Sequence, residues 1–272
     1  MEVKITDDVI VGGSKFTVMA GPCMAESIEI CMETGRFLKQ ICADLGVNYI
    51  FKASYDKANR SSDYTARGPG RMAGLAMLLD VKNELKVPIV TDVHEAADVA
   101  PVAQVADILQ IPAFLCRQTD LLHAAGSSNR AVNIKKGQFM APEDMAGAIE
   151  KIHSTGNQRV MLTERGACFG YHNLINDMRA LVVMRSLGVP VVFDATHSVQ
   201  LPGGNGNCSG GRREFVRPLA RGAAAVGIDA LFIEVHPDPD HALSDGPNSL
   251  NFEQAEQVIR EVKAVHEFIR SL

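Results

Sequence analysis

One pattern constrains the fold more than any other. Short runs rich in β-forming residues recur eight times along the chain, and segments with helical periodicity separate them. Strands and helices that alternate in this way favour parallel pairing with right-handed crossovers. The expected strands are Phe16–Cys23, Tyr49–Asp56, Pro88–His94, Ile108–Leu115, Ala131–Gln138, Val160–Gly166, Val191–Ser198 and Ala230–Asp238. The clearest expected helices are Glu26–Leu45, Met72–Leu85, Met178–Leu187 and Asn251–Leu272.

The number of strands and the length of the chain together favour a closed barrel. A (β/α)8 TIM barrel takes about 250 residues, and this chain has 272, with no linker or repeat to mark a second domain. We therefore expect one α/β domain over residues 1–272. A doubly wound open sheet is the alternative, but no GxGxxG follows the first strand. Val3–Ile5 and Val9–Val11 flank an Asp-Asp turn, which predicts a β-hairpin within residues 1–15 that caps the barrel floor.

The composition excludes several classes of partner. Hydrophobic residues make up 46% of the chain and charged residues 22%, as in a globular enzyme with a sizeable core. The net charge is −5 and no run of Lys or Arg stands out, so neither a nucleic acid nor a membrane partner is expected. Asp7 and Asp8 stand where a signal peptide would be apolar, and we expect a cytoplasmic protein. Cys31 and Cys42 lie on the apolar stripe of a predicted helix and are expected in the core.

Each predicted strand begins with apolar residues and ends in polar or charged ones. Barrel enzymes place their active sites at the carboxyl ends of the strands, on the loops that follow. We therefore expect the functional site at this end of the barrel. The side chains concerned are Cys23, Lys52, Asp92, His94, Arg117, Lys135, Arg165, His197, Glu234 and His236.

A candidate metal site follows from barrel closure, which makes the first, seventh and eighth strands neighbours. These strands supply Cys23, His197 and Glu234, and the loop after the eighth adds Asp245. A thiolate, an imidazole and two carboxylates suit a divalent transition metal such as Fe²⁺, Zn²⁺, Mn²⁺ or Co²⁺. The same spacing would also result from a cysteine at the rim, a histidine that forms a hydrogen bond and two solvated acids. The spacing alone therefore leaves both interpretations open.

Basic residues gather on the opposite arc of the same rim. In a protein that is acidic overall, a cluster of cations at the barrel mouth predicts a small ligand with several negative charges, such as a phosphate with a carboxylate. Solvated surface charges are the alternative interpretation. The cluster comprises Lys52, Lys57, Arg117, Lys135, Lys136 and Arg165.

Several segments resemble one enzyme family. Phe51–Ser62 is similar to the signature of the 3-deoxy-D-manno-octulosonate 8-phosphate synthases, also called 2-dehydro-3-deoxyphosphooctonate aldolases, and its Lys57–Ser62 part is the most specific. The other similar segments are Gln110–Asp120, Asn133–Phe139, Glu164–Gly166 with Phe169–Tyr171, Asp194–His197 and Glu234–Pro239. The resemblance covers essentially the whole chain. It implies a homotetrameric transferase. The enzyme would join phosphoenolpyruvate, D-arabinose 5-phosphate and water and release phosphate. Its product would serve lipopolysaccharide core biosynthesis.

The family has a metal-requiring and a metal-free branch, and the resemblance assigns this chain to the first. Ala20–Cys23 is similar to the metal-requiring branch, where the other branch has Asn in place of Cys. Gly246–Pro247, after Asp245, is more similar to the metal-free branch. Cys23 is a ligand that only one branch possesses, so it decides the assignment.

The resemblance also implies roles for individual residues. The metal would be bound by Cys23, His197, Glu234 and Asp245. Catalysis would involve Lys57, His197 and Asp245. Lys57, Lys135 and Arg165 would hold the phosphate and carboxylate of phosphoenolpyruvate, with Lys52 and Ser54 close by. Asn59, Arg60 and Ser61 would face the sugar phosphate, and Arg117 would reach in from a neighbouring subunit. Asp92 and Gln110 would line the floor of the site, and Phe114 would form a wall.

Two other functions compete with this interpretation. The related synthase that uses erythrose 4-phosphate at the entry to aromatic biosynthesis shares the barrel, the Gly-Pro-Cys motif and the metal. The Lys57–Ser62 segment argues against it. A non-catalytic anion-binding or regulatory barrel would require the metal ligands or the basic cluster to be broken, and both are complete in the sequence.

Overall fold

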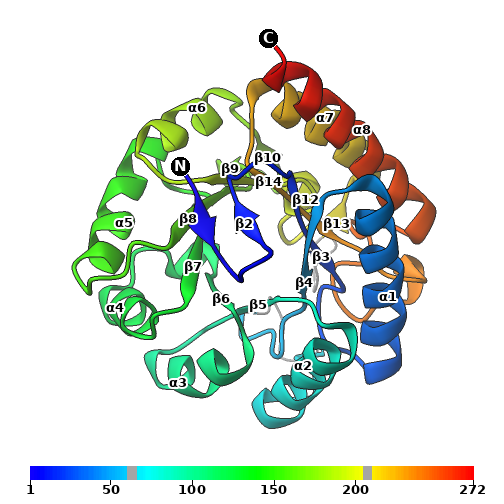
Figure 1. Ribbon diagram of the computed structural model, residues 1–272, viewed down its shortest axis with the longest axis horizontal. Helices are drawn as coiled ribbons and strands as arrows, with labels where there is room; N and C mark the ends of the chain where they lie inside the picture. The colour runs from blue at the N-terminus through cyan, green and yellow to red at the C-terminus, as the bar shows by residue number, and fades with distance from the viewer. Residues whose placement is uncertain (60–65, 205–209) are drawn as a thin grey trace.

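The computed structural model describes residues 1–59, 66–204 and 210–272. Eight parallel strands close into a barrel in the order β11-β14-β3-β4-β5-β6-β7-β8 (Figure 1). The closed barrel confirms the predicted fold class. The strands are β3 (Thr17–Gly21), β4 (Asn48–Lys52), β5 (Ile89–Asp92), β6 (Ile108–Ile111), β7 (Ala131–Lys135), β8 (Val160–Glu164), β11 (Val191–Asp194) and β14 (Ala230–Glu234).

The helices form a ring outside the strands (Figure 1). They are α1 (Ile28–Leu45), α2 (Arg71–Leu85), α3 (Ala96–Val105), α4 (Thr119–Ser127), α5 (Ala146–His153), α6 (Arg179–Ser186), α7 (Val216–Val226) and α8 (Phe252–Arg270). Ser27 caps α1, and Asn251 with Gln254 forms a capping box at the start of α8. No helix in the described ranges is both long enough and apolar enough to cross a membrane.

Short strands lie outside the barrel. In Figure 1 the hairpin of β1 (Val3–Lys4) and β2 (Ile10–Val11) lies across one end of the barrel. Its Val3 and Val11 are buried against the inward-facing side chains of the barrel strands, as expected of a hairpin that caps the floor. The loops that follow β8 and β11 each contain a small antiparallel pair. The four strands are β9 (Ala167–Cys168), β10 (Leu174–Ile175), β12 (Gln200–Leu201) and β13 (Gly210–Gly211).

The barrel interior changes from apolar to polar along the strands. Near the hairpin the inward positions are apolar, and include Met19, Ile50, Val90, Ile108, Ala131, Met161, Val192 and Phe232. Because side chains alternate between the two faces of a strand, the next inward position lies two residues further on. At seven of these eight strands that position is buried and polar: Lys52, Asp92, Gln110, Asn133, Thr163, Asp194 and Glu234. Burying so many polar groups is costly unless they are paired, and this polar layer forms the base of the site.

Candidate active site

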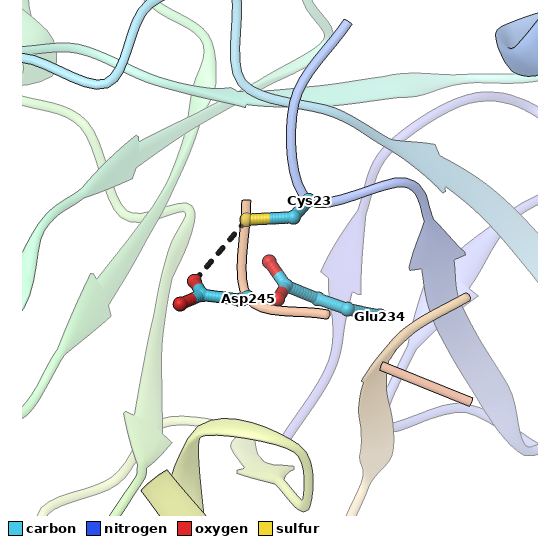
Figure 2. Close-up of side chains that lie close together, drawn as sticks. All are labelled: Cys23, Glu234 and Asp245. Carbon is cyan, nitrogen blue, oxygen red and sulfur yellow. Dashed lines mark hydrogen bonds between the residues drawn. The ribbon is translucent and has the colours of Figure 1, made fainter. Parts of the chain in front are cut away.

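Three candidate metal ligands meet at the carboxyl ends of adjacent strands (Figure 2). Cys23 follows β3, Glu234 ends β14, and Asp245 lies in the loop between β14 and α8. The Cys23 sulfur and one carboxylate oxygen from each acid all lie within 4.8 Å of one another. The Cys23 sulfur lies 3.1 Å from Ser244 Oγ and 3.2 Å from Asp245 Oδ2, so its one thiol proton can be donated to either oxygen.

Gly21 permits the close approach of β3 and β4 just below this group. A Cβ atom on Gly21 would lie 2.2 Å from the Lys52 carbonyl oxygen. Any larger residue would therefore push the two strands apart and displace Cys23, two residues further along. Asp245 itself has a left-handed backbone, with φ of 51°. A non-glycine residue in that conformation is a local strain of the kind that often occurs at functional sites.

His197 stands beside these three residues rather than within the tight group. It begins the 3-10 turn η3 (His197–Val199) after β11. Its Nε2 atom lies 3.7 Å from Glu234 Oε1 and 3.7 Å from Asp245 Oδ2. Its Nδ1 atom lies 2.8 Å from Asp194 Oδ2, so the carboxylate orients the ring with Nε2 toward the other ligands.

These distances fit a bound divalent ion. Four ligands about 2.1 Å from a tetrahedral ion lie about 3.4 Å from one another, close to the separations of 3.2 and 3.7 Å found here. Glu234 Oε2 is buried and has no hydrogen-bond partner among the described residues. A buried carboxylate oxygen without a partner is costly, and a cation would satisfy it. Cys23, Glu234 and Asp245 could therefore hold a divalent metal ion, with His197 beside them.

The charges around the group also favour a cation. Burial raises the pKa of the Cys23 thiol far above its usual value, and the nearby Asp245 and Glu234 raise it further. Burial would raise the pKa of the Glu234 carboxyl as well, but the charges of His197 and Lys52 outweigh it and hold that pKa below its usual range. The thiol therefore keeps its proton unless a cation takes its place, whereas Glu234 is ionised.

Three predicted anion-binding side chains lie close to oxygen acceptors of the site. Lys52 Nζ lies 2.6 Å from Glu234 Oε1. Lys135 Nζ lies 3.1 Å from Asp194 Oδ2, with the ring of Phe232 4.4 Å away. Arg165, also buried, donates to the Gln200 side chain at 3.1 Å. The predicted basic cluster is thus interleaved with acceptors, which hold its charges in place inside the barrel.

Lys57 and Asp92 form a second group at the carboxyl ends of β4 and β5. Lys57 Nζ donates to Ser54 Oγ at 3.0 Å, and Ser54 donates to Asp92 Oδ2 at 2.5 Å. Burial lowers the pKa of Lys57, but the nearby carboxylates of Glu234, Asp92 and Asp245 raise it above its usual value. Burial likewise raises the pKa of Asp92, yet nearby lysines hold that pKa below its usual range. Both side chains are therefore charged at neutral pH.

Two members of the predicted basic cluster do not join it. Lys136 directly follows β7, and its Nζ lies 3.6 Å from Glu164 Oε2 rather than among the inward-facing cations, so the prediction is wrong for this residue. Arg117 follows β6, on the opposite side of the barrel from β14, and lines a cavity of about 310 Å³ next to α5. It is exposed and does not reach the site of its own chain, so its predicted role in the site of a neighbouring subunit stays a prediction.

The remaining predicted substrate residues are placed as follows. Gln110 is fully buried beside Asp92, to which it donates a hydrogen bond of 2.8 Å. Phe114 is 52% exposed in the turn η1 (Ala113–Leu115). Asn59 is exposed after β4. Arg60 and Ser61 lie outside the described residues.

Sequence reasoning missed three residues of the site. Gln200 accepts from Arg165 and donates to Asp245 Oδ1 at 3.1 Å, and so connects the anion-binding and metal-binding halves. It lies in the two-residue strand β12, where no periodicity could have identified it. In the sequence, Asp194 and Asn133 stand out only as parts of the motifs that resemble the family. They lie two residues after the inward-facing Val192 and Ala131, and this alternation could have identified them.

The fold and the site together define a class of protein. A closed (β/α)8 barrel with candidate metal ligands and buried cations at the carboxyl ends of its strands is a TIM-barrel enzyme with a site for anionic substrates. A family model described as the DAHP synthetase I family matches residues 1–271. The chain belongs to that family.

Curated relatives narrow the similarity further. Three similar proteins are each named 2-dehydro-3-deoxyphosphooctonate aldolase. That of Desulfotalea psychrophila is 54% identical over 259 residues, covering 95% of this chain and 92% of its own. That of Syntrophotalea carbinolica is 54% identical, covering 98% and 97%. That of Desulfatibacillum aliphaticivorans is 56% identical, covering 93% of each. The resemblance inferred from the motifs is thereby confirmed.

Proposed function

We propose that this protein condenses phosphoenolpyruvate with D-arabinose 5-phosphate and water, giving 3-deoxy-D-manno-octulosonate 8-phosphate and phosphate. The reaction is an aldol-type carbon–carbon bond formation of the transferase class, and its product would serve lipopolysaccharide core biosynthesis. The name shared by the relatives supports this assignment. The observation that carries it is the polar layer, in which buried cations for an anionic substrate lie beside a group of metal ligands.

The cations have the task of holding two anionic substrates in contact. Lys135, Arg165 and Lys57 would hold the phosphate and carboxylate of phosphoenolpyruvate, with Lys52 and Ser54 nearby. Asn59, Arg60 and Ser61 would hold the sugar phosphate. C3 of phosphoenolpyruvate then attacks the aldehyde carbon, water adds at C2, and phosphate leaves by C–O cleavage. Fixing the reactants at van der Waals distance supplies much of the rate enhancement of such a bimolecular step.

Two side chains are suited to proton transfer. The 2.8 Å contact with Asp194 orients the His197 ring, so that its Nε2 faces the site and can carry a proton to or from a substrate oxygen. Lys57 remains an ammonium ion in its surroundings, so it would act as an acid or as a fixed charge. Asp245 would complete the catalytic group.

Cys23, His197, Glu234 and Asp245 would hold a divalent transition metal, with Fe²⁺, Zn²⁺, Mn²⁺ and Co²⁺ as candidates. A thiolate among the ligands favours such metals over Mg²⁺ or Ca²⁺. When bound, the ion supplies a Lewis acid that orients or polarises an oxygen atom. The remaining work of binding and orienting the substrates falls to the chain's own side chains.

We infer a homotetramer in the cytoplasm from the family resemblance, and the exposed positions of Phe114 and Arg117 leave both side chains available to a neighbouring subunit. Neither side chain is part of the metal-binding group of its own chain, and Phe114 leaves a large apolar surface open to solvent. Residues of this kind become useful when they reach the site of a neighbouring subunit. We therefore include Phe114 as a wall and Arg117 as a phosphate ligand contributed in trans.

A turnover assay with phosphoenolpyruvate and each aldose phosphate tests the function. We expect D-arabinose 5-phosphate to react at least about a hundredfold better than erythrose 4-phosphate, since a lost phosphate contact costs about 2–3 kcal/mol. Comparable kcat/KM for erythrose 4-phosphate would support the related synthase, which the names of the relatives do not favour. No turnover with either sugar would support a non-catalytic barrel.

A further inference from the structure

Four polar side chains from four consecutive strands form one hydrogen-bonded chain inside the barrel. Thr163 Oγ1 on β8 donates to Asn133 Oδ1 on β7 at 2.8 Å, and Asn133 Nδ2 donates to Gln110 Oε1 on β6 at 3.0 Å. Gln110 Nε2 in turn donates to Asp92 Oδ1 on β5 at 2.8 Å. Asp92, Gln110 and Asn133 are also paired partners in the parallel sheet, so their side chains stand at one level.

The direction of this chain is fixed at one end. An ionised carboxylate only accepts hydrogen bonds, so Asp92 requires the amide nitrogen of Gln110 to face it. The Gln110 oxygen must then face Asn133, and the Asn133 oxygen must face Thr163. Only a donor at position 163 can satisfy that last oxygen, and the Thr163 hydroxyl is that donor. Every amide in the row is thereby locked in one orientation.

The other side of Asp92 leads to the reacting groups. Its Oδ2 atom accepts the Ser54 proton, so the Ser54 oxygen is left to accept from Lys57 Nζ. Asn133 and Thr163 are fully buried, and the hydrogen bonds of this row connect them to Asp92 through Gln110. Their effect on Asp92 therefore passes through Gln110.

We propose that Asn133 and Thr163 are positioning residues that fix the Asp92–Ser54–Lys57 array for catalysis. The proposal rests on the function proposed above and adds two residues to its machinery. A purely structural role would not require polar side chains here, because the layer beneath them is filled by Ala131 and Met161. A buried polar row is stable only when every member is satisfied, so the loss of one donor should disturb the whole row.

The test compares isosteric variants of two buried threonines. Thr163→Val removes the donor without changing volume, whereas Thr163→Ser keeps the hydroxyl. Thr91→Val is the matched control, because Thr91 precedes Asp92, is equally buried, and its hydroxyl has no partner among the described residues. We expect Thr163→Val to lower kcat about threefold to tenfold, the effect of one lost hydrogen bond. Thr163→Ser and Thr91→Val should remain close to wild type, as should KM for the sugar phosphate in all three.

A double-mutant cycle with Ser54→Ala provides a readout that a structural role would not move. Residues in one hydrogen-bonded network couple, whereas distant independent residues are additive. The losses in kcat of Thr163→Val and Ser54→Ala should therefore be non-additive, and those of Thr91→Val and Ser54→Ala additive. Additive losses in both cycles, or equal losses for the two valine variants, would overturn the proposal. Thr163→Ala replaces Thr163→Val if the latter does not fold.

Binding of phosphoenolpyruvate, measured by calorimetry, separates this proposal from the assigned function. A wild-type protein that binds phosphoenolpyruvate but makes no product from arabinose 5-phosphate contradicts the assigned function. In that case, weaker binding by Thr163→Val alone would still support the positioning role. Equal binding and equal kcat for Thr163→Val and wild type would overturn the positioning role and leave the function intact.

Discussion

Lys52 and Glu234 form an ion pair in the barrel interior: Lys52 Nζ lies 2.6 Å from Glu234 Oε1, and the two side chains are 1% and 0% exposed. Lys52 also donates to the Cys23 carbonyl at 3.0 Å. One lysine therefore joins the ends of β3, β4 and β14, and it compensates the charge of a candidate metal ligand. Glu234 Oε1 is occupied by this lysine, whereas Oε2 is left without a partner among the described residues.

Replacing Lys52 tests how much the pair stabilises the barrel. Lys52→Met keeps most of the volume but leaves Glu234 as an uncompensated buried charge, which typically costs about 3–5 kcal/mol. We expect the free energy of unfolding in urea to fall by an amount within that range. The double variant Lys52→Met/Glu234→Gln should regain most of the loss. A single variant as stable as wild type would contradict this account.

The fold was predictable because its signal is periodic. All eight barrel strands start within one residue of their predicted positions, since each apolar run begins where the strand enters the core. The predicted strands extend beyond the observed ones. For example, β4 ends at Lys52, although the apolar run continues through Ala53 and Tyr55. Strand ends depend on the register of the closed barrel, which a local pattern does not contain.

The site was predictable to the extent that it follows from strand order. Cys23 and Glu234 could be placed together because barrel closure makes β3 and β14 neighbours. Lys135 and Lys136 could not both face inward, because adjacent residues of a strand point to opposite faces. A prediction that places Lys135 and Lys136 in one cluster does not respect that alternation. Gln200 was not predictable, because its position depends on the conformation of the loop after β11.

Removing the buried cations tests substrate binding. Lys135→Ala and Arg165→Ala should each raise KM for phosphoenolpyruvate and lower kcat, because these groups both bind the anion and position C3. Losing a charge-assisted hydrogen bond should reduce kcat/KM by about ten- to a hundredfold. Arg179→Ala is the control, since the Arg179 side chain is 88% exposed and pairs with the nearby Asp177. Wild-type steady-state parameters in both buried variants would show that neither cation holds substrate.

Acid should destabilise the protein partly through Asp92. Its pKa in the folded protein is held below the usual range, so the folded state binds the proton less readily than the unfolded chain. The stabilisation is therefore complete above about pH 4 and is lost as the pH falls through the lower, folded pKa. Below about pH 4, the free energy of unfolding of wild type should fall faster than that of Asp92→Asn, by up to about 1.4 kcal/mol per pH unit. Parallel curves for the two proteins would contradict this.

Chelation tests the metal centre directly. We expect chelators to abolish turnover and a divalent transition metal to restore it. Cys23→Ser should bind the metal far more weakly and be nearly inactive, because an imidazole and two carboxylates remain without the thiolate. The fold should persist in each case, since the barrel has its own apolar core and loses only the linkage energy of a bound ion. Elemental analysis, with activity before and after chelation, provides the measurement.

The control for that experiment is a cysteine outside the metal-binding group. Cys168 lies in β9 and is partly exposed, so Cys168→Ser should keep both the metal content and the activity of wild type. Metal content separates two causes of inactivity. If the Cys23→Ser protein is folded and metal-free, it has lost a metal ligand. If it keeps its full metal content, its inactivity has a cause other than metal loss. Full activity in a verified metal-free preparation of the wild type would exclude the metal from the reaction. The condensation chemistry would then rest on the substrate-binding side chains and on His197 without a metal, and Cys23 would be a buried rim residue whose thiol keeps its proton.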